Sequence, residues 1–459
     1  MSAPCTEVGN VLHGAAAVPF SLDNAPLTRR HLVVVLIIAA GWFWDVGVVS
    51  IGSVLSTVFS EKSSTVSTGA LSWVVASAFL GAIVGAATFG WAADRFGRRR
   101  TLITTLLLLA VSACGAALSP SIEWLIVCRT LSGVAIGAYP VVAVPYLAEM
   151  LPVRARGRMH LIAAGMGAVA LPATLLGTRL LADSVDGDAW RWICAICATG
   201  SALTVIAMLE LPEPPKWLRS RGRAGAAELV ERAFVSAPPL SDKCISDVQT
   251  SREFSTSRST ALAPPDSARY VKTSVLATFV ILLNVLGPWT TAGFPILSGA
   301  VLVSRGFSVA DSFLFSGLGA VGIVLGLFVA SWKIDTLERR TVLIGCALMI
   351  SACAIWFSLA NRPVSIVVAG ILVTSAMAVF IQTMNMYVAE MFTTRVRALG
   401  LSSGSFVNRL TGACVPLVLL PVLHTRGAVW LSAIQAGTML VGAVLLSIAP
   451  RGNAGRRID

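Results

Sequence analysis

The sequence has few charged residues for its length. Only 13% of its 459 residues are Asp, Glu, Lys or Arg, whereas a soluble globular domain carries about a quarter. Apolar residues make up 56% of the chain, and the charges gather in short clusters between long apolar runs. This pattern excludes an ordinary soluble protein. It indicates a chain that crosses a membrane many times, because about 20 apolar residues span a ~30 Å hydrocarbon core.

Several chemical signatures are also missing. The chain has no GxxxxGK[ST] loop, so ATP-driven transport is not expected. Its nine cysteines are scattered, mostly within apolar runs, and indicate no disulfide framework. Cys194 and Cys197 form a CxxC pair, but no histidine lies beside them to complete a metal site. We therefore predict no metal, no cofactor and no enzymatic activity. The net charge of +12 comes from loops that flank the spans, which argues against a nucleic-acid partner.

Long apolar runs divide the chain into segments. We predict twelve spans, at about residues 31–59, 68–92, 100–118, 122–147, 159–181, 191–209, 272–303, 311–332, 341–359, 363–388, 398–423 and 427–449. The predicted parts are a polar tail (1–30), a six-helix bundle (31–210), a central loop (211–271), a second six-helix bundle (272–449) and a short tail (450–459). Within the loop, residues 211–234 predict one or two amphipathic surface helices, and residues 237–268 predict a flexible linker.

Two motifs occur twice in the chain at one spacing. The basic loop with Asp94 and Arg98 returns with Asp335 and Arg339, a shift of 241 residues. The YLAEM stretch that begins at Tyr146 returns as YVAEM with the same shift of 241 residues. Two independent motifs with one offset predict two copies of one half, and repeated apolar halves are typical of secondary transporters. Glycine pairs at helical spacing predict close helix packing. Examples are Gly81 and Gly85, Gly133 and Gly137, and Gly322 and Gly326.

The basic residues predict the orientation in the membrane. If both termini are cytosolic, most lysines and arginines fall on the cytosolic side. The outer segments then contain only Lys62, Arg179, Arg191, Arg305, Arg362 and Arg426. By the positive-inside rule we expect a multi-pass protein of the cell membrane with both termini, both basic loops and both YxAEM motifs in the cytosol.

The motifs resemble those of the major facilitator superfamily. The Gly90–Arg100 stretch matches the signature loop of the superfamily, and Phe43–Gly52 is similar to the first span of its sugar-porter-like members. RTLSGVAIG at Arg129–Gly137, the YxxExxPxxxRG pattern from Tyr146 and LPEPPKWLRSRGR at Leu211–Arg223 resemble further motifs of those members. The resemblance implies an all-α membrane protein with twelve transmembrane helices in two pseudo-symmetric six-helix bundles. It also implies transport by alternating access.

The resemblance divides between two branches of the superfamily. Sugar porters usually have a QQ pair in the seventh span and GPxxW in the tenth, but here the seventh span has Asn284 and the tenth lacks GPxxW. The stretch Ala389–Gly412 looks more like the organic-ion and synaptic-vesicle-protein-like branches, in which an Arg like Arg409 follows in the eleventh span. The resemblance therefore leaves an organic solute and a sugar as alternative substrates.

Two charges lie deep in spans of the first half. At 1.5 Å per residue, Asp45 lies ~18 Å from the cytosolic edge of its span and Arg129 lies ~10 Å from the outer edge of a span that runs the other way. Both therefore have about the same depth, and we expect them to form an ion pair. Protonation of Asp45 would break the pair, and in the resembled symporters an Asp–Arg pair at the matching positions couples transport to protons. The alternative is a static salt bridge that only orients the helices.

Arg409 is the deep charge of the second half, ~16 Å into its span. No acidic residue of that half has a similar depth, so we interpret Arg409 as a contact for a carboxylate or phosphate on the substrate. The alternative is an Arg that binds backbone carbonyls or Asp45 across the bundle interface. Further candidates for substrate binding are Asn284, Gln382, Asn385, Trp289 and Tyr139.

Acidic and basic residues also meet at the predicted cytosolic ends of the spans, in both halves. We predict that they form ion-pair networks that latch the bundles together when the site faces outward. The alternative is a basic rim that only sets topology. The predicted gate residues are Asp94, Arg98, Glu149 and Arg156 in the first half and Asp335, Arg339, Glu390 and Arg397 in the second.

The sequence as a whole predicts a secondary active transporter. We expect it to be a monomer in a lipid bilayer that moves a small organic solute, an organic anion in the leading interpretation, together with protons. A sugar porter or an uncoupled facilitator is the first alternative. A transporter-like receptor or vesicle protein that moves nothing is the second.

Overall fold

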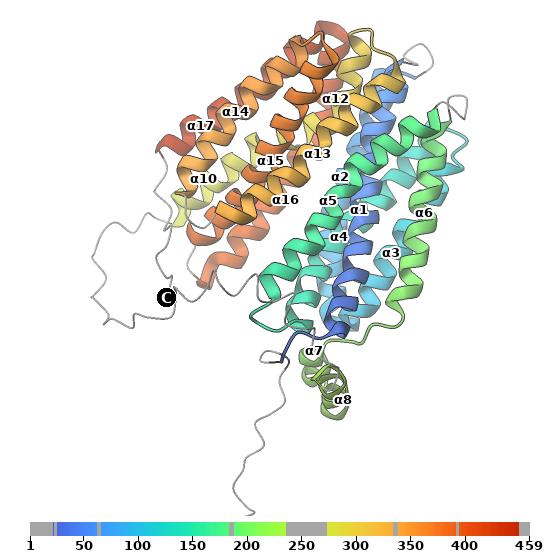
Figure 1. Cartoon of the computed structure of the whole chain (residues 1–459), viewed down its shortest axis with the longest axis vertical. Coiled ribbons are helices and arrows are strands. Elements are labelled where there is room, and N and C mark those ends of the chain that lie inside the picture. Colours follow the sequence, from blue (N-terminus) through green and yellow to red (C-terminus); the bar gives the residue numbers. More distant parts are fainter. Residues whose placement is uncertain are drawn as a thin grey trace, which may run out of the picture.

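The computed structural model describes residues 22, 25–61, 66–182, 188–235, 273–333, 338–391 and 394–448. Side chains are not described at residues 273–276, 330–333, 389–391 and 394–402. The described part is helical, and twelve of its helical segments are long and apolar enough to cross a membrane. The predicted all-α membrane fold is confirmed. Figure 1 shows the helices in two bundles, side by side.

The first bundle consists of six helices, whose bounds are α1 (Arg29–Glu61), α2 (Thr68–Phe96), α3 (Arg98–Ala117), α4 (Ile122–Met150), α5 (Arg156–Ala182) and α6 (Ala189–Met208). Serine side chains cap the starts of α2 and α4: Ser67 and Ser121 accept hydrogen bonds from the backbone N–H groups of Ala70 and Trp124, respectively. Several helices are longer than the predicted spans because polar ends, such as Ala93–Phe96 of α2 and Arg156–Arg158 of α5, continue the helix beyond the apolar run.

Two short helices follow the first bundle, α7 (Pro215–Ser220) and α8 (Ala224–Val235). They confirm the prediction of surface helices in the first part of the central loop. Arg219 of α7 contacts the buried carboxylate of Glu231 on α8 at 2.5 Å. We call the end of the molecule that carries α7 and α8 the linker end, and the opposite end the far end (Figure 1). The predicted linker at residues 237–268 lies outside the described residues.

The second bundle repeats the architecture with one difference, in its first span. The bounds are α10 (Thr273–Leu286), α11 (Pro288–Thr291), α12 (Gly293–Ser304), α13 (Val309–Lys333), α14 (Arg339–Leu359), α15 (Pro363–Met391), α16 (Thr394–Arg426) and α17 (Ala428–Ile448). The first three together form the seventh span, whose helical hydrogen bonding is irregular at Gly287 and Ala292 although both keep right-handed helical backbone angles. Proline at 288 lacks a backbone N–H, so one helical hydrogen bond is missing there.

Glycines explain the closest helix contacts in each bundle. In the first bundle a Cβ at Gly81 would lie 2.1 Å from the carbonyl oxygen of Thr130, so only glycine lets α2 and α4 come this close. In the second bundle a Cβ at Gly322 would lie 2.2 Å from the carbonyl oxygen of Ile371, at the matching contact of α13 with α15. The prediction from the glycine pairs is confirmed, and so is the predicted pseudo-symmetry.

The two bundles meet along three helix pairs, α1 with α12, α2 with α16 and α5 with α13. Contacts in the far half include a hydrogen bond from Ser56 to the carbonyl of Ile296 and the packing of Thr57 against Gly299. The ribbons are close at the far end and diverge toward the linker end (Figure 1). This conformation therefore holds the bundles together mainly through their far halves.

Candidate functional site

Asp45 lies in the middle of α1, inside the first bundle. Its side chain is buried, with 3% of the residue exposed, and the oxygen Oδ1 has no hydrogen-bond partner among the described residues. A carboxylate with an unsatisfied oxygen is costly inside a membrane protein, and such a group is a functional candidate for that reason. Asp45 is therefore buried at the middle of its helix, and both its depth in the membrane and its role stay predictions.

Arg129 on α4 is equally buried but does not pair with Asp45. Its Nη1 atom donates a hydrogen bond to the carbonyl of Val48 at 2.8 Å, and its Nε atom has no partner in the described part of the chain. The expected ion pair between Asp45 and Arg129 is thus wrong for this conformation. Helical rise gives only the depth of each residue, and here the guanidinium binds the backbone three residues beyond Asp45 instead.

Arg409 on α16 is the charge that reaches across the bundle interface. Its Nη1 atom donates a hydrogen bond of 2.6 Å to the carbonyl of Ala82 on α2. This hydrogen bond belongs to the alternative interpretation of Arg409, that of an Arg that binds backbone carbonyls or Asp45 across the bundle interface.

A small cavity lies between the bundles beside these charges. It has a volume of about 40 Å³, and Arg129 is the charged residue on its wall. The remaining wall consists of apolar side chains and glycine from α1, α2, α4 and α12, namely Val49, Gly52, Val75, Ala78, Phe79, Ala82, Ile136 and Ile296. Ligand pockets usually measure ~300 Å³ or more, so a solute fits here only when the bundles move apart.

The other residues predicted to contact the substrate differ in burial and in hydrogen bonding. Tyr139 is fully buried and its hydroxyl donates to the carbonyl of Ile38 at 2.7 Å, so in this conformation it packs α4 against α1. Asn284 donates to Val280 in its own helix at 2.9 Å. Gln382 is half-buried and Asn385 is exposed. Their roles, like that of the half-buried Trp289, stay predictions.

Sequence reasoning missed Gln435 on α17. This side chain is buried, and its Nε2 atom donates to the carbonyl of Trp289 at 3.3 Å. The backbone carbonyl of Gln435 accepts the hydroxyl of Thr290 at 2.9 Å. Together these contacts fasten the segment after Pro288 in the seventh span to the last helix. A single amide in an otherwise apolar last span was the available signal.

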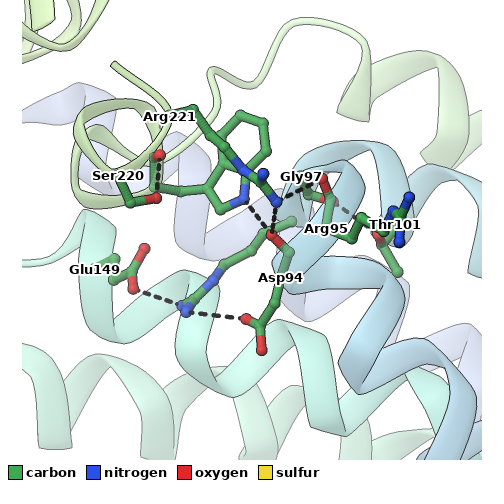
Figure 2. A network of polar contacts seen from close by, with 9 residues as sticks. Asp94, Arg95, Gly97, Thr101, Glu149, Ser220 and Arg221 are labelled. Carbon is green, nitrogen blue, oxygen red and sulfur yellow. Dashed lines mark hydrogen bonds and ion pairs between the residues drawn. The ribbon is translucent and has the colours of Figure 1, made fainter. Parts of the chain in front are cut away.

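A polar network occupies the linker end of the first bundle (Figure 2). Arg98 at the start of α3 contacts Glu149 at 2.8 Å and Asp94 at 4.0 Å. Arg156 donates from Nε to the carbonyl of Leu151 at 3.0 Å. The predicted first-half gate residues therefore surround the ends of α2, α3, α4 and α5. Because Arg98 and Glu149 are themselves mostly shielded, this pair is firmer than an exposed ion pair.

The second-half gate residues are less fully described. Asp335 lies outside the described residues. Glu390 and Arg397 lie in α15 and α16, in stretches whose side chains are outside the described part. Arg339 is buried at the start of α14. The predicted second half of the gate stays a prediction.

Glu213 also belongs to this network, although it was not among the gate residues predicted from the sequence. The Glu213 carboxylate accepts hydrogen bonds from the backbone N–H groups of Arg99 and Arg100, at 3.0 and 3.3 Å. A carboxylate at a helix N-terminus satisfies free N–H groups and the helix dipole. Gly97 makes this possible, because it has a φ of 111° and a Cβ there would lie 2.5 Å from the carboxylate. The LPEPPKWL motif, which supplies Glu213, was the signal.

The central loop is fastened to the same network by two further contacts. Trp217 and Arg221 donate to the backbone carbonyl of Asp94, at 3.0 and 2.8 Å (Figure 2). The Asp94 carboxylate itself is 81% exposed. It therefore remains accessible for a contact beyond the first bundle, while the backbone around it is fixed by α7.

The fold and the charges together define a polytopic membrane transporter. The family described as "sugar (and other) transporter" matches residues 32–449, which is nearly the whole chain. The chain belongs to this family, and thus to the major facilitator superfamily as a sugar-porter-like member.

Several known transporters are similar over most of their length. A niacin transporter of Acinetobacter baylyi is 26% identical over 411 residues, covering 87% of this chain and 88% of the relative. A D-xylose transporter of Levilactobacillus brevis is 26% identical over 420 residues, covering 88% and 87%. The structure of the xylose transporter from E. coli in a partially occluded inward open conformation has a TM-score of 0.73 at 17% identity. It covers 93% of this chain and 99% of the other.

Proposed function

We propose that this protein is a proton-coupled secondary transporter that moves a small organic anion across the cell membrane by alternating access. The observation that carries the proposal is a set of three buried or half-buried charges: Arg409 crosses the bundle interface, Arg129 lines the cavity there and Asp45 lies inside the first bundle. Arg129 and Arg409 bring two positive charges, and Asp45 brings one negative charge. With Asp45 ionised the group has a net charge of +1, which favours a monoanion inside an apolar cavity.

Proton coupling is assigned to Asp45. A buried carboxyl with an unpaired oxygen is costly to ionise, whereas a guanidinium that comes near it favours the ionised form, so the protonation of Asp45 would depend on how close Arg409 and the second bundle are. When Arg409 moves away with the second bundle, Asp45 takes up a proton. When Arg409 returns, the proton leaves. Arg129 supports this cycle by fixing the α1 backbone at Val48, one turn beyond Asp45.

Alternating access is assigned to the helix pairs between the bundles. Contacts such as Ser56 with Ile296 hold the far end closed here. The linker end closes in the opposite state, and we assign the latch to the network of Arg98, Glu149 and the exposed Asp94 together with its repeat in the second half. The excess of Lys and Arg at the linker end supports a cytosolic position for this end.

Sugar transport, with or without proton coupling, is the second candidate. It is favoured by the family match and by the D-xylose relative, whereas the niacin relative favours an acid. Against a sugar stands the wall of the cavity, which offers apolar groups where a polyol needs hydrogen-bond partners.

Uptake by the purified protein in proteoliposomes distinguishes the candidates. Radiolabelled benzoate and D-xylose are supplied outside at pH 6, with the interior at pH 7.5, and empty vesicles correct for diffusion of uncharged acid. The proposal expects protein-dependent uptake of benzoate above that of xylose, abolished by a protonophore. Uptake of xylose alone would favour the sugar porter, and uptake of neither would favour a receptor or vesicle protein that moves nothing.

A further inference from the structure

Arg409 reaches α2 through a notch in the first bundle, at Gly137 of α4. A Cβ at position 137 would lie 2.6 Å from Nη1 of Arg409 and 2.1 Å from the carbonyl oxygen of Ala82. Nη1 donates to that same carbonyl at 2.6 Å. Only a glycine therefore leaves room for the guanidinium and the carbonyl to meet at this point.

The contact joins the two bundles near their centre. Ala82 belongs to the first bundle and Arg409 to the second, and one turn beyond Arg409 the ring of Phe79 packs against Gly412. A backbone carbonyl is a neutral acceptor, and in a helix it already accepts one hydrogen bond. A carboxylate is a better partner for a guanidinium, because its hydrogen bonds are charge-assisted and can be bidentate. An anion that reaches Arg409 therefore displaces Ala82.

The surroundings of this contact define what kind of anion fits. Ala82 and Phe79 belong to the wall of the cavity, whose remaining side chains, apart from Arg129, are apolar. A hydroxyl-rich ligand would lose its hydrogen bonds to water here without replacement. A ligand with one carboxylate and an apolar body satisfies both the charge and the walls.

We propose that Arg409 is a switchable clasp between the bundles, bound to Ala82 in the empty protein and to the carboxylate of a small apolar monocarboxylic acid in the loaded one. Gly137 is the positioning residue that keeps the clasp at the cavity. Release of Ala82 removes a bond between the bundles, so binding of the acid and separation of the bundles occur together. The inference rests on the proposed transport of an organic anion, but binding tests it without transport.

The test measures binding to the purified full-length protein in detergent at pH 7.5, with benzoate as the probe and uncharged benzamide as the matched ligand. We expect calorimetry to detect benzoate and not benzamide, and we expect benzoate to raise the thermal midpoint. Arg409→Gln is expected to lower the affinity for benzoate at least about tenfold, the loss typical of a charge-assisted hydrogen bond. Arg409→Lys keeps the charge but not the planar guanidinium, so its affinity for benzoate is expected to fall less.

Two glycine variants distinguish an effect on the Arg409 clasp from an effect on the packing of α2 against α4. Gly133→Ala disturbs α2 and α4 as Gly137→Ala does, because a Cβ there would lie 2.1 Å from the carbonyl of Ala78, but it does not face Arg409. Both variants are expected to lower the thermal midpoint similarly. Only Gly137→Ala is expected to change benzoate affinity. If the glycine variants do not fold, the comparison of Arg409→Gln with Arg409→Lys decides.

Equal benzoate affinity in the wild type and Arg409→Gln, or equal binding of benzamide, would overturn the clasp. Xylose uptake without any benzoate binding would overturn it too, while leaving the protein a transporter. Arg409-dependent benzoate binding in a protein that transports nothing would support the clasp and contradict the proposed function.

Discussion

Arg129 donates a hydrogen bond to the backbone carbonyl of Val48 in α1 and also lines the cavity. We expect Arg129→Gln to abolish proton-driven accumulation and to lower the free energy of unfolding by about 1–3 kcal/mol, since it removes a charged hydrogen bond to a buried carbonyl. The measurement pairs proteoliposome uptake with the thermal midpoint.

Arg191→Gln is the control for this prediction. Arg191 binds the carbonyls of Ala117 and Ser119 at the far end, at 2.8 and 2.9 Å, and does not line the cavity. This variant should lose stability and keep coupled uptake. Coupled uptake that survives in Arg129→Gln would make Arg129 a structural residue alone.

For the buried charged residues, the sequence predicted how far along its helix each one lies, but not which group its side chain contacts. Helical rise locates Asp45 and Arg129 within one turn of each other along the membrane normal. It does not give the direction in which each side chain leaves its helix. The contact of Arg409 with Ala82 joins residues 327 apart in the chain and depends on the notch at Gly137, which only the packed structure reveals.

Among the elements, α3 depends on a residue from the central loop. Glu213→Gln removes the negative charge from the N-terminus of α3 while keeping the shape of the side chain. We expect a loss of about 1 kcal/mol in the free energy of unfolding, the usual value for a charged helix cap. Thermal unfolding of the purified protein checks it.

Glu228→Gln provides the matched control for α3. Glu228 on α8 has an exposed pair with Arg232 at 3.8 Å, which contributes little to stability. An equal thermal midpoint for the Glu213 and Glu228 variants would contradict the capping role of Glu213.

The long apolar runs predicted the helices well, since a span must satisfy its backbone within itself. The glycine pairs predicted which helices approach closely. The irregular hydrogen bonding of the seventh span near Pro288 was not predicted, because hydropathy measures the length of an apolar run and is insensitive to a single missing backbone hydrogen bond.

For the whole molecule, the distribution of basic residues predicts that the linker end is cytosolic. An epitope inserted at residues 240–260 should be accessible to antibody only after the cells are permeabilised. An epitope at residue 362, in a predicted outer segment, serves as the opposite control. Labelling of the 240–260 epitope in intact cells would reverse the orientation.

The latch also belongs to this scale, because it requires both bundles. Asp94 is 81% exposed and Arg98 is 4.0 Å away, so Asp94→Lys should change the stability of the first bundle by less than about 1 kcal/mol. We expect it to weaken the state closed at the linker end. Thiol labelling of a Val141→Cys reporter, which lines the recess beside Asp94, should become faster.

The reporter requires a background in which Cys5, Cys244 and the exposed Cys114 and Cys414 are serine. Lys216→Gln on α7 is a second surface charge variant for comparison, and it should label like the reporter alone. Unchanged labelling in Asp94→Lys would favour a basic rim that only sets topology.

Proton-driven accumulation in Asp45→Asn tests the central claim most directly. The variant keeps the shape of a protonated carboxyl and cannot release a proton. In proteoliposomes with an acid exterior, and with initial rates corrected by protein-free vesicles for diffusion of uncharged acid, we predict that wild-type protein concentrates labelled benzoate inside. Asp45→Asn is predicted to exchange internal for external benzoate at a similar rate without concentrating it. Accumulation by Asp45→Asn equal to that of the wild type would contradict coupling through this carboxylate.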